Sequence, residues 1–235
     1  MSQSDASADD LLSALYPSMR DEPANAKERD EAAMASALLL AVQQKVEASL
    51  KVKTQFFEKN SEQLVRAASL ISQSYQNGGR LLTAGNGGSA CDAAHLAVEF
   101  MHPVTTGRPA LAAINLSQDV TMMSAVANDV GFDQVLKRQL IAMAQPNDVL
   151  VVFSTSGNSN NLIAACNKAA EMGLSVIAFV GGHGGQMAKL GAISELLLVE
   201  TDSVHRIQEC HLMCYHILWD LVHSQLAETR GSRVK

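Results

Sequence analysis

The sequence predicts an α/β protein: a doubly wound parallel sheet of five strands flanked by helices, with a helical extension at the amino-terminal end. Two observations predict this class. Five short apolar runs lack the alternation of polar and apolar residues that a half-exposed strand shows, as expected for strands buried on both faces. Each run is followed by a segment that can be read as a helix, the order found in parallel sheets. The runs cover residues 81–85, 110–114, 148–154, 175–181 and 195–200.

Size and composition fit this class. The chain has 235 residues, of which 47% are hydrophobic and 18% are charged, and this suits one main core. The formal net charge of −6 argues against direct binding to nucleic acid, which depends on Lys and Arg. No apolar stretch approaches the roughly 20 residues that span a bilayer, and the start of the chain does not resemble a signal peptide. We therefore expect a cytoplasmic protein that does not bind a membrane.

The four cysteines lie in segments that read as helix: Cys91, Cys166, Cys210 and Cys214. We interpret them as reduced thiols of a cytoplasmic protein. Cys210 and Cys214 are four positions apart, which would also suit two ligands of a metal. We prefer buried thiols, because a free cysteine behaves as a small hydrophobic residue.

The amino-terminal part divides into two regions. Residues 1–35 are rich in Ser, Asp, Glu and Ala, and we expect an acidic, flexible tail or a loosely docked helix. From about residue 36 to 74, apolar residues recur at helical spacing until Asn77-Gly78-Gly79, which predicts one long helix or two. This apolar face is longer than one small core needs, which suggests a second copy of the chain as its partner. Residues 36–235 then form one domain, whose last helix begins at residue 203.

The loop after the first strand contains Asn86-Gly87-Gly88-Ser89 and opens a helix. Ligands of open α/β sheets bind at the carboxyl ends of the strands. Glycines allow the backbone to approach a ligand closely, and the first N–H groups of a helix attract anions. The alternative is a glycine-rich turn that serves only close packing.

The loop after the third strand, Ser154-Thr155-Ser156-Gly157-Asn158-Ser159, carries four hydroxyl groups and an amide. Hydroxyls and backbone N–H groups can surround a phosphate monoester without a lysine. A helix cap is the alternative, but it needs a single hydroxyl, so we favour a phosphate site. The loop lacks the G-x-x-x-x-G-K-[ST] pattern of nucleoside triphosphate sites.

The groups able to move a proton lie on two helices. His95 and Glu99 are four positions apart and share one face of the helix behind the first loop. Gln208 and His216 are eight apart on the last helix, about 80° around its axis, whereas His211 lies about 140° from His216. In isolation, each of these groups can equally be structural. Their nearness to a predicted phosphate loop favours a functional role.

Five segments together resemble the phosphoheptose isomerases, which belong to the sugar isomerase (SIS) domain family. The segments, which cover the chain from about residue 36 to 228 in the same order, are GNGGSACDAAHLAVEF, RPALAAI, AVANDVGF, DVLVVFSTSGNS and RIQECHLMCYHIL. The resemblance implies a homotetramer with active sites between subunits. It also implies conversion of sedoheptulose 7-phosphate, a phosphorylated seven-carbon sugar, to D-glycero-D-manno-heptose 7-phosphate, which leads to nucleotide-activated heptose.

The resemblance also implies roles for individual residues. Glu99 and His216 match the catalytic acid–base pair. The positions that match substrate-binding residues are Asn86, Gly87, Gly88, Ser89, Asn128, Asp129, Ser154, Thr155, Ser156, Ser159 and Gln208. Some members carry zinc, one ion per subunit, on the positions that match His95, Glu99, Gln208 and His216.

These residue types suit the implied reaction. A ketose becomes an aldose when a proton moves between adjacent carbons through an enediol, so one group takes a proton while another serves the oxygens. We expect Glu99 to take the carbon-bound proton and His216 to serve the oxygens. A zinc ion on Glu99 would make this carboxylate a weaker base. Three alternatives then stay open: the metal departs, the carboxylate shifts, or another group takes the proton while the metal polarises the substrate.

The chain departs from the family at Pro103, where the better-known isomerases carry an arginine that contacts the substrate. Arg108, Arg206 or His102 would have to replace that contact, or the phosphosugar differs.

Two other classes compete with the enzyme. The DnaA initiator-associating proteins have the same fold and act as binding proteins, but they lack the catalytic glutamate and the second histidine that this chain retains. A phosphosugar-sensing domain of a regulator is less well supported, because no DNA-binding segment is evident.

Overall fold

The computed structural model describes residues 31–232. The chain forms two compact units, which are divided between Gln44 and Lys45, and the second unit contains the sheet. Residues 1–30 of the predicted tail lie outside the described residues, and residues 31–35 are the first of a long helix. The predicted domain boundary at residue 35 stays a prediction. No helix in the described part of the chain is both long enough and apolar enough to cross a bilayer.

The predicted five-stranded parallel sheet is confirmed, with strand order β2-β1-β3-β4-β5. Its strands are β1 (Leu81–Gly85), β2 (Ala113–Asn115), β3 (Val149–Ser154), β4 (Ser175–Gly181) and β5 (Glu195–Val199). The helices are α2 (Glu31–Gln76), α3 (Gly88–Met101), α4 (Val120–Val130), α5 (Val135–Met143), α6 (Asn160–Glu171) and α7 (Val204–Ser232). Two 3₁₀ turns cover Phe132–Gln134 and Met187–Lys189.

Strand β2 differs from the prediction for residues 110–114. It begins later, at Ala113, and pairs with β1 over three residues. The reason is that the preceding segment is still bound to the end of α3, since the N–H of Leu111 donates to the carbonyl of Phe100. The long helix predicted from residue 36 is one continuous helix, α2.

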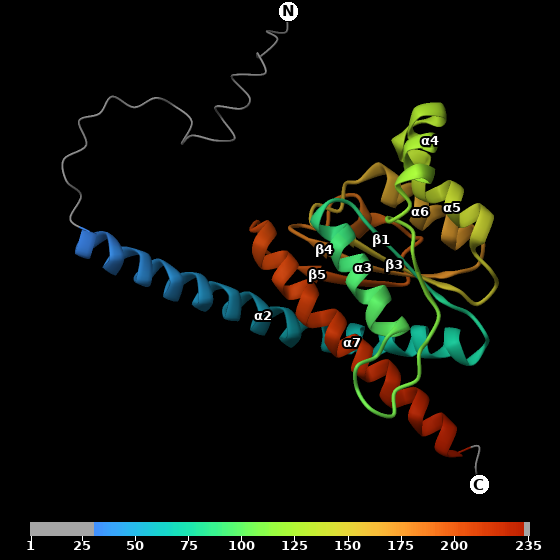
Figure 1. Ribbon diagram of the computed structural model, residues 1–235, viewed down its shortest axis with the longest axis horizontal. Helices are drawn as coiled ribbons and strands as arrows, with labels where there is room; N and C mark the ends of the chain where they lie inside the picture. Colours follow the sequence, from blue (N-terminus) through green and yellow to red (C-terminus); the bar gives the residue numbers. More distant parts are fainter. Residues whose placement is uncertain (1–30, 233–235) are drawn as a thin grey trace, which may run out of the picture. The chain divides into compact units, whose positions relative to one another are not determined.

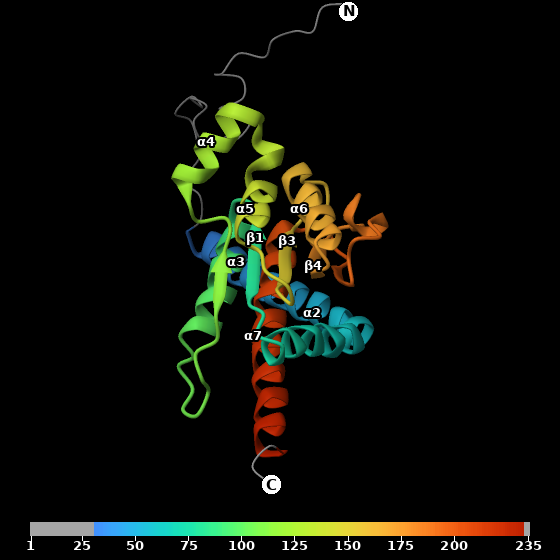
Figure 2. The same ribbon diagram turned by 90° about the vertical axis from the view of Figure 1, so that its right-hand side faces the viewer.

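Two apolar clusters cover the two faces of the sheet, as the unbroken apolar strands predicted. One cluster joins odd-numbered positions of β1 and β3, such as Leu81 and Phe153, to α2, α3 and α7. The other joins the intervening positions, such as Leu82 and Val152, to α4, α5 and α6. Figures 1 and 2 show the strands between these two sets of helices. All residues of β1 and β3 are buried, which explains why their sequences do not alternate.

Helices α3 and α7 run side by side in the same direction, with a constant register of 120 positions (Figure 1). At one end, Gly88 lies against Gln208: a side chain at this glycine would place its Cβ 2.1 Å from the Gln208 amide nitrogen. Further along, the Tyr215 hydroxyl lies 2.8 Å from Nδ1 of His95. At the far end, Nε1 of Trp219 donates to the carbonyl of Glu99 at 2.9 Å. The register therefore determines which residues of the two helices meet.

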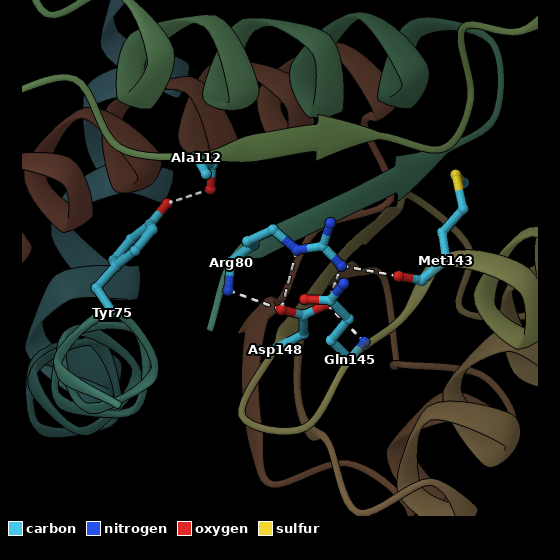
Figure 3. Close-up of polar contacts among 6 residues, drawn as sticks. All are labelled: Tyr75, Arg80, Ala112, Met143, Gln145 and Asp148. Atoms are coloured by element: carbon cyan, nitrogen blue, oxygen red, sulfur yellow. Dashed lines mark hydrogen bonds and ion pairs between the residues drawn. The ribbon is translucent and has the colours of Figure 1, made fainter. Parts of the chain in front are cut away.

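An ion pair with a buried carboxylate lies at the amino-terminal edge of the sheet (Figure 3). The side chain of Asp148, which directly precedes β3, is fully buried. It accepts hydrogen bonds from the backbone N–H of Arg80 at 2.7 Å, from the Arg80 guanidinium, and from the N–H of Gln145 at 2.9 Å. The guanidinium also donates to the carbonyl of Met143, at 2.7 Å. We call Arg80, Asp148, Gln145 and Met143 the amino-edge cluster.

Candidate active site

The loop after β1 leaves hydrogen-bond donors free at the start of α3. Gly87 has φ of +54°, a conformation that glycine adopts without strain. No side chain caps this helix. Within residues 31–232, the N–H groups of Gly87 and Gly88 and the hydroxyl of Ser89 donate to no acceptor. Free N–H groups at a helix start are a general feature of anion sites, so this loop fits the phosphate-binding role predicted for it.

The loop after β3 divides its four hydroxyls into two groups. The Ser154 oxygen accepts from the N–H of Gly157 at 3.0 Å, and the Ser156 oxygen accepts from the N–H of Asn158 at 3.3 Å. These two side chains therefore shape the loop, while their own O–H groups donate to no acceptor among the described residues, so their predicted contact with phosphate stays a prediction. Thr155 and Ser159 form no side-chain hydrogen bond in the described part of the chain, and Ser159 does not cap α6. Their hydroxyls remain available to a ligand.

His95, Glu99 and His216 form a cluster on α3 and α7, which we call the histidine–carboxylate cluster. One ligand atom from each of the three side chains lies within 4.8 Å of the others. Nε2 of His95 is 3.1 Å from Oε1 of Glu99. The side chains of His95 and Glu99 are 41% and 24% exposed, and His216 is exposed, so the cluster opens to solvent. Two imidazoles and a carboxylate are the three protein ligands of many catalytic zinc sites, so the donor set fits zinc.

Two further groups of this region were missed by sequence reasoning. Tyr215 is 1% exposed, and its hydroxyl contacts Nδ1 of His95, which leaves Nε2 to face Glu99. Burial is the main cause that raises the pKa of Tyr215, so its hydroxyl stays protonated. Oδ2 of Asp92 is buried without a hydrogen bond among the described residues. Burial raises the pKa of Asp92 to about 6, against the opposing effect of His95.

Sequence signals for these two residues existed. Asp92 lies one helical turn before His95, and Tyr215 immediately precedes His216. Neither spacing alone identifies a functional residue. A single tyrosine on an apolar helix most often packs in the hydrophobic core.

The structure does not bring Gln208 to the histidine–carboxylate cluster of the same chain. Gln208 lies beside Gly88, and the helix register then places it about 10 Å along the axis from the level of His95. Gln208 therefore belongs to the region of the first loop in this chain. Its role as a fourth metal ligand stays a prediction, and within an assembly it would have to come from another copy.

Asn128 and Asp129 lie exposed at the end of α4. The amide of Asn128 donates to Oδ1 of Asp129 at 3.0 Å. No contact within residues 31–232 joins either side chain to the two loops or to the histidine–carboxylate cluster. Their predicted contact with substrate stays a prediction.

The arginines considered as replacements at Pro103 both have acidic partners. The guanidinium of Arg108 donates to Asp220 at 2.7 Å and lies over the ring of Trp219, 5.6 Å from its centre. Arg206 donates to Glu209 at 2.8 Å. Arg108 thus fastens the segment after α3 to α7, next to the carbonyl of Glu99 that Trp219 binds.

Comparison with known proteins shows the family to which the chain belongs. A family model described as SIS domain matches residues 46–181. The phosphoheptose isomerase of Chlorobium phaeovibrioides is 42% identical over 187 residues, which are 79% of this chain and 87% of that protein. The phosphoheptose isomerase of Aquifex aeolicus is 38% identical over 77% of this chain and 93% of its own.

A solved structure extends the likeness to three dimensions. The phosphoheptose isomerase from Neisseria gonorrhoeae is 38% identical, with a TM-score of 0.74 over 80% of this chain and 99% of that chain. The shared fold and the extent of these identities show that the chain belongs to the phosphoheptose isomerases of the SIS domain family.

Proposed function

We propose that this protein is an aldose–ketose isomerase that converts sedoheptulose 7-phosphate to D-glycero-D-manno-heptose 7-phosphate. In a cell this would be the first step towards nucleotide-activated heptose, the precursor of lipopolysaccharide heptose. The observation that carries the proposal is the meeting of Glu99 and His216, from two helices far apart in sequence, in a protein whose relatives are named phosphoheptose isomerases. A purely binding role of the DnaA initiator-associating type is not favoured, because both groups are retained.

Glu99 and His216 have distinct tasks in this reaction. Glu99 takes the proton from the carbon beside the carbonyl, and His216 exchanges protons with the substrate oxygens as the enediol forms and collapses. His95 holds the Glu99 carboxylate by the 3.1 Å contact at Nε2. The hydroxyls of Ser89, Ser154, Thr155, Ser156 and Ser159, with the free N–H groups of the first loop, would bind the phosphate.

The same residues would hold zinc, one ion per subunit, and Glu99 would then act as the base once the metal has departed or its carboxylate has shifted. His95, Glu99 and His216 supply three ligands, and a catalytic zinc takes its fourth from water, substrate or another side chain. When bound, zinc supplies a Lewis acid that polarises a carbonyl oxygen.

The active site is completed by a second copy of the chain, in a homotetramer. Gln208 and the start of α3 lie about 10 Å along the helix axis from His95 of the same chain, and the histidine–carboxylate cluster is open to solvent. A neighbouring copy can supply both a cover and a fourth ligand. In the second unit, Val46 and Leu50 of α2 expose apolar side chains that suit such a contact. In the first unit, α2 exposes Leu38, Leu39, Leu40 and Val42.

The cytoplasm is the compartment that best suits the cysteines. Cys91, Cys166, Cys210 and Cys214 are free thiols, and disulfides are rare in that compartment.

The reaction can be tested directly. Purified protein is incubated with sedoheptulose 7-phosphate, and the aldose is followed by NMR. We expect Glu99→Gln to lower kcat by about 10²- to 10⁴-fold, since a general base contributes this much. Glu171→Gln, an exposed carboxylate on α6, is the control. Zinc content and melting temperature of each variant separate loss of the base from loss of metal or fold. No aldose from the wild type, or near-normal turnover by Glu99→Gln with zinc still bound, would contradict the proposal.

A further inference from the structure

The side chains of Asn86 and Asn161 form a closed pair between the two loops. Nδ2 of Asn86 donates to Oδ1 of Asn161 at 2.9 Å, and Nδ2 of Asn161 donates to Oδ1 of Asn86 at the same distance. The arrangement is self-complementary, because exchanging oxygen and nitrogen in both amides preserves both hydrogen bonds. We call these two residues the asparagine pair.

The two partners lie in segments that follow two neighbouring strands. Asn86 follows β1, and Asn161 is the second residue of α6, beyond the loop that follows β3. Strands β1 and β3 are adjacent and parallel, with Gly85 opposite Phe153. The two loops therefore leave the same edge of the sheet side by side, and the asparagine pair is a direct side-chain link between them.

Asn161 is placed as a positioning residue rather than as a ligand. It is 2% exposed, whereas Asn160 beside it is exposed. Asparagine near a helix start commonly satisfies the free N–H groups of its own helix. Here the amide of Asn161 instead reaches across to Asn86, although no side chain of Ser159 caps α6. Each amide of the pair uses one donor and one acceptor on the other.

The first loop is held from its other side by Ser117, which follows β2. The hydroxyl of Ser117 accepts from the N–H of Gly85 at 3.0 Å and donates to the carbonyl of the same residue at 2.8 Å. The last residue of β1 and the first residue of the loop thus have separate side-chain anchors. With both in place, the start of α3 has a fixed position relative to the start of α6.

We propose that Asn161, acting through Asn86, sets the spacing between the helix starts of α3 and α6, so that both bind one phosphate group. Among the described residues, the free donors at these two places include the N–H groups of Gly87 and Gly88 and the hydroxyls of Ser89, Thr155 and Ser159. Two helix starts can act on one anion only at a fixed separation, because charge-assisted hydrogen bonds weaken steeply with distance and angle. This inference rests on the proposed function and adds a residue that the family resemblance did not supply.

The test measures binding of inorganic phosphate by calorimetry, which needs no turnover. We expect Asn161→Ala to raise the phosphate Kd about tenfold, because it removes two hydrogen bonds and leaves the Asn86 amide unpaired. The KM for sedoheptulose 7-phosphate rises by a similar factor, while kcat changes less than about threefold, since Asn161 does not touch the reacting carbons. Asn160→Ala is the matched control and leaves both constants unchanged.

A double-mutant cycle separates positioning from a general structural role. If Asn161 acts through Asn86, adding Asn161→Ala to Asn86→Ala changes the phosphate Kd less than about twofold. Equal losses in both backgrounds would show that Asn161 acts independently and would overturn the proposal. Asn161→Ser replaces the alanine variant if the latter does not fold.

The remaining outcomes are also decisive. A phosphate Kd of Asn161→Ala within twofold of the wild type overturns the proposal, as does a wild type that binds no phosphate. A wild type that binds phosphate but does not isomerise the sugar contradicts the proposed function alone. The cycle on phosphate binding then still decides the role of Asn161.

Discussion

The amino-edge cluster and the histidine–carboxylate cluster each contain a carboxylate, but the two carboxylates differ in how many of their hydrogen-bond acceptor positions are filled. Asp148 is fully buried and accepts from both Arg80 and the N–H of Gln145 (Figure 3). Glu99 is partly exposed, and the contact that its carboxylate makes among the described residues is with His95. A carboxylate whose acceptor positions are filled can hold parts of the fold together, whereas one with unused positions can bind a ligand or take a proton.

Two tyrosines repeat this contrast. The Tyr75 hydroxyl donates to the carbonyl of Ala112 at 3.1 Å and ties α2 to the segment before β2. The Tyr215 hydroxyl contacts a histidine ring that faces the open carboxylate. Burial raises the pKa of both hydroxyls, so both stay protonated at neutral pH. The same chemical group therefore stabilises the fold in one place and orients a functional side chain in the other.

The largest expected effect is on stability and comes from a substitution that removes the buried carboxylate of the amino-edge cluster. Asp148→Ala leaves the Arg80 guanidinium without its carboxylate, and removing one partner of a buried ion pair costs about 3–5 kcal/mol. We expect the free energy of unfolding, measured with urea, to fall by that amount. Activity per folded molecule should persist, because none of the hydrogen bonds of the cluster among the described residues involves His95, Glu99 or His216.

The exposed pair Lys168–Glu171 provides the comparison. Glu171→Ala should change stability by no more than about 0.5 kcal/mol, since surface ion pairs contribute little. If both alanine variants are equally stable, the view that the amino-edge cluster stabilises the fold is wrong.

A smaller effect concerns His211, which is buried like Asp148 but has no charged partner within residues 31–232. It lies beside the rings of Phe153 and Phe179, and burial lowers its pKa to about 3, with the nearby Val180 backbone only partly opposing this. Because the unfolded chain binds this proton near pH 6.5 and the folded chain does not, stability falls as pH drops below 6.5.

The expected slope for this group is about 1.4 kcal/mol per pH unit below pH 6. Melting temperatures measured from pH 7 to pH 5 should fall less steeply for His211→Leu than for the wild type. Parallel curves for the two proteins would show that His211 does not titrate in this way.

The smallest effect compares the two tyrosines. Tyr215→Phe removes the hydroxyl that orients His95, and loss of such an outer partner lowers metal affinity about tenfold or somewhat more. Zinc affinity, measured by competition with a chromophoric chelator, gives a readout that does not depend on turnover. Tyr75→Phe should leave zinc affinity unchanged while lowering stability by about 1 kcal/mol. Equal zinc affinities for both variants would refute the orienting role of Tyr215.

Much of the fold could be predicted from sequence, because buried parallel strands and long amphipathic helices leave strong periodic patterns. The limits of β2 could not be predicted, since the apolar run at 110–114 carries no sign that Leu111 would bind Phe100. The pairing of Glu99 with His216 was expected from family resemblance, not from spacing. Contacts between distant segments, such as Asn86 with Asn161 or His95 with Tyr215, leave no local pattern, so the sequence alone could not reveal them.

The constant offset between α3 and α7 limits how this protein can change. One extra residue between Gln208 and Tyr215 would turn the rest of α7 by about 100° and move Tyr215, His216 and Trp219 off their partners together. Point substitutions can alter these contacts one at a time, but an insertion or deletion within this part of α7 would remove all of them together. Insertions and deletions that preserve function should therefore occur in the segments outside these two helices.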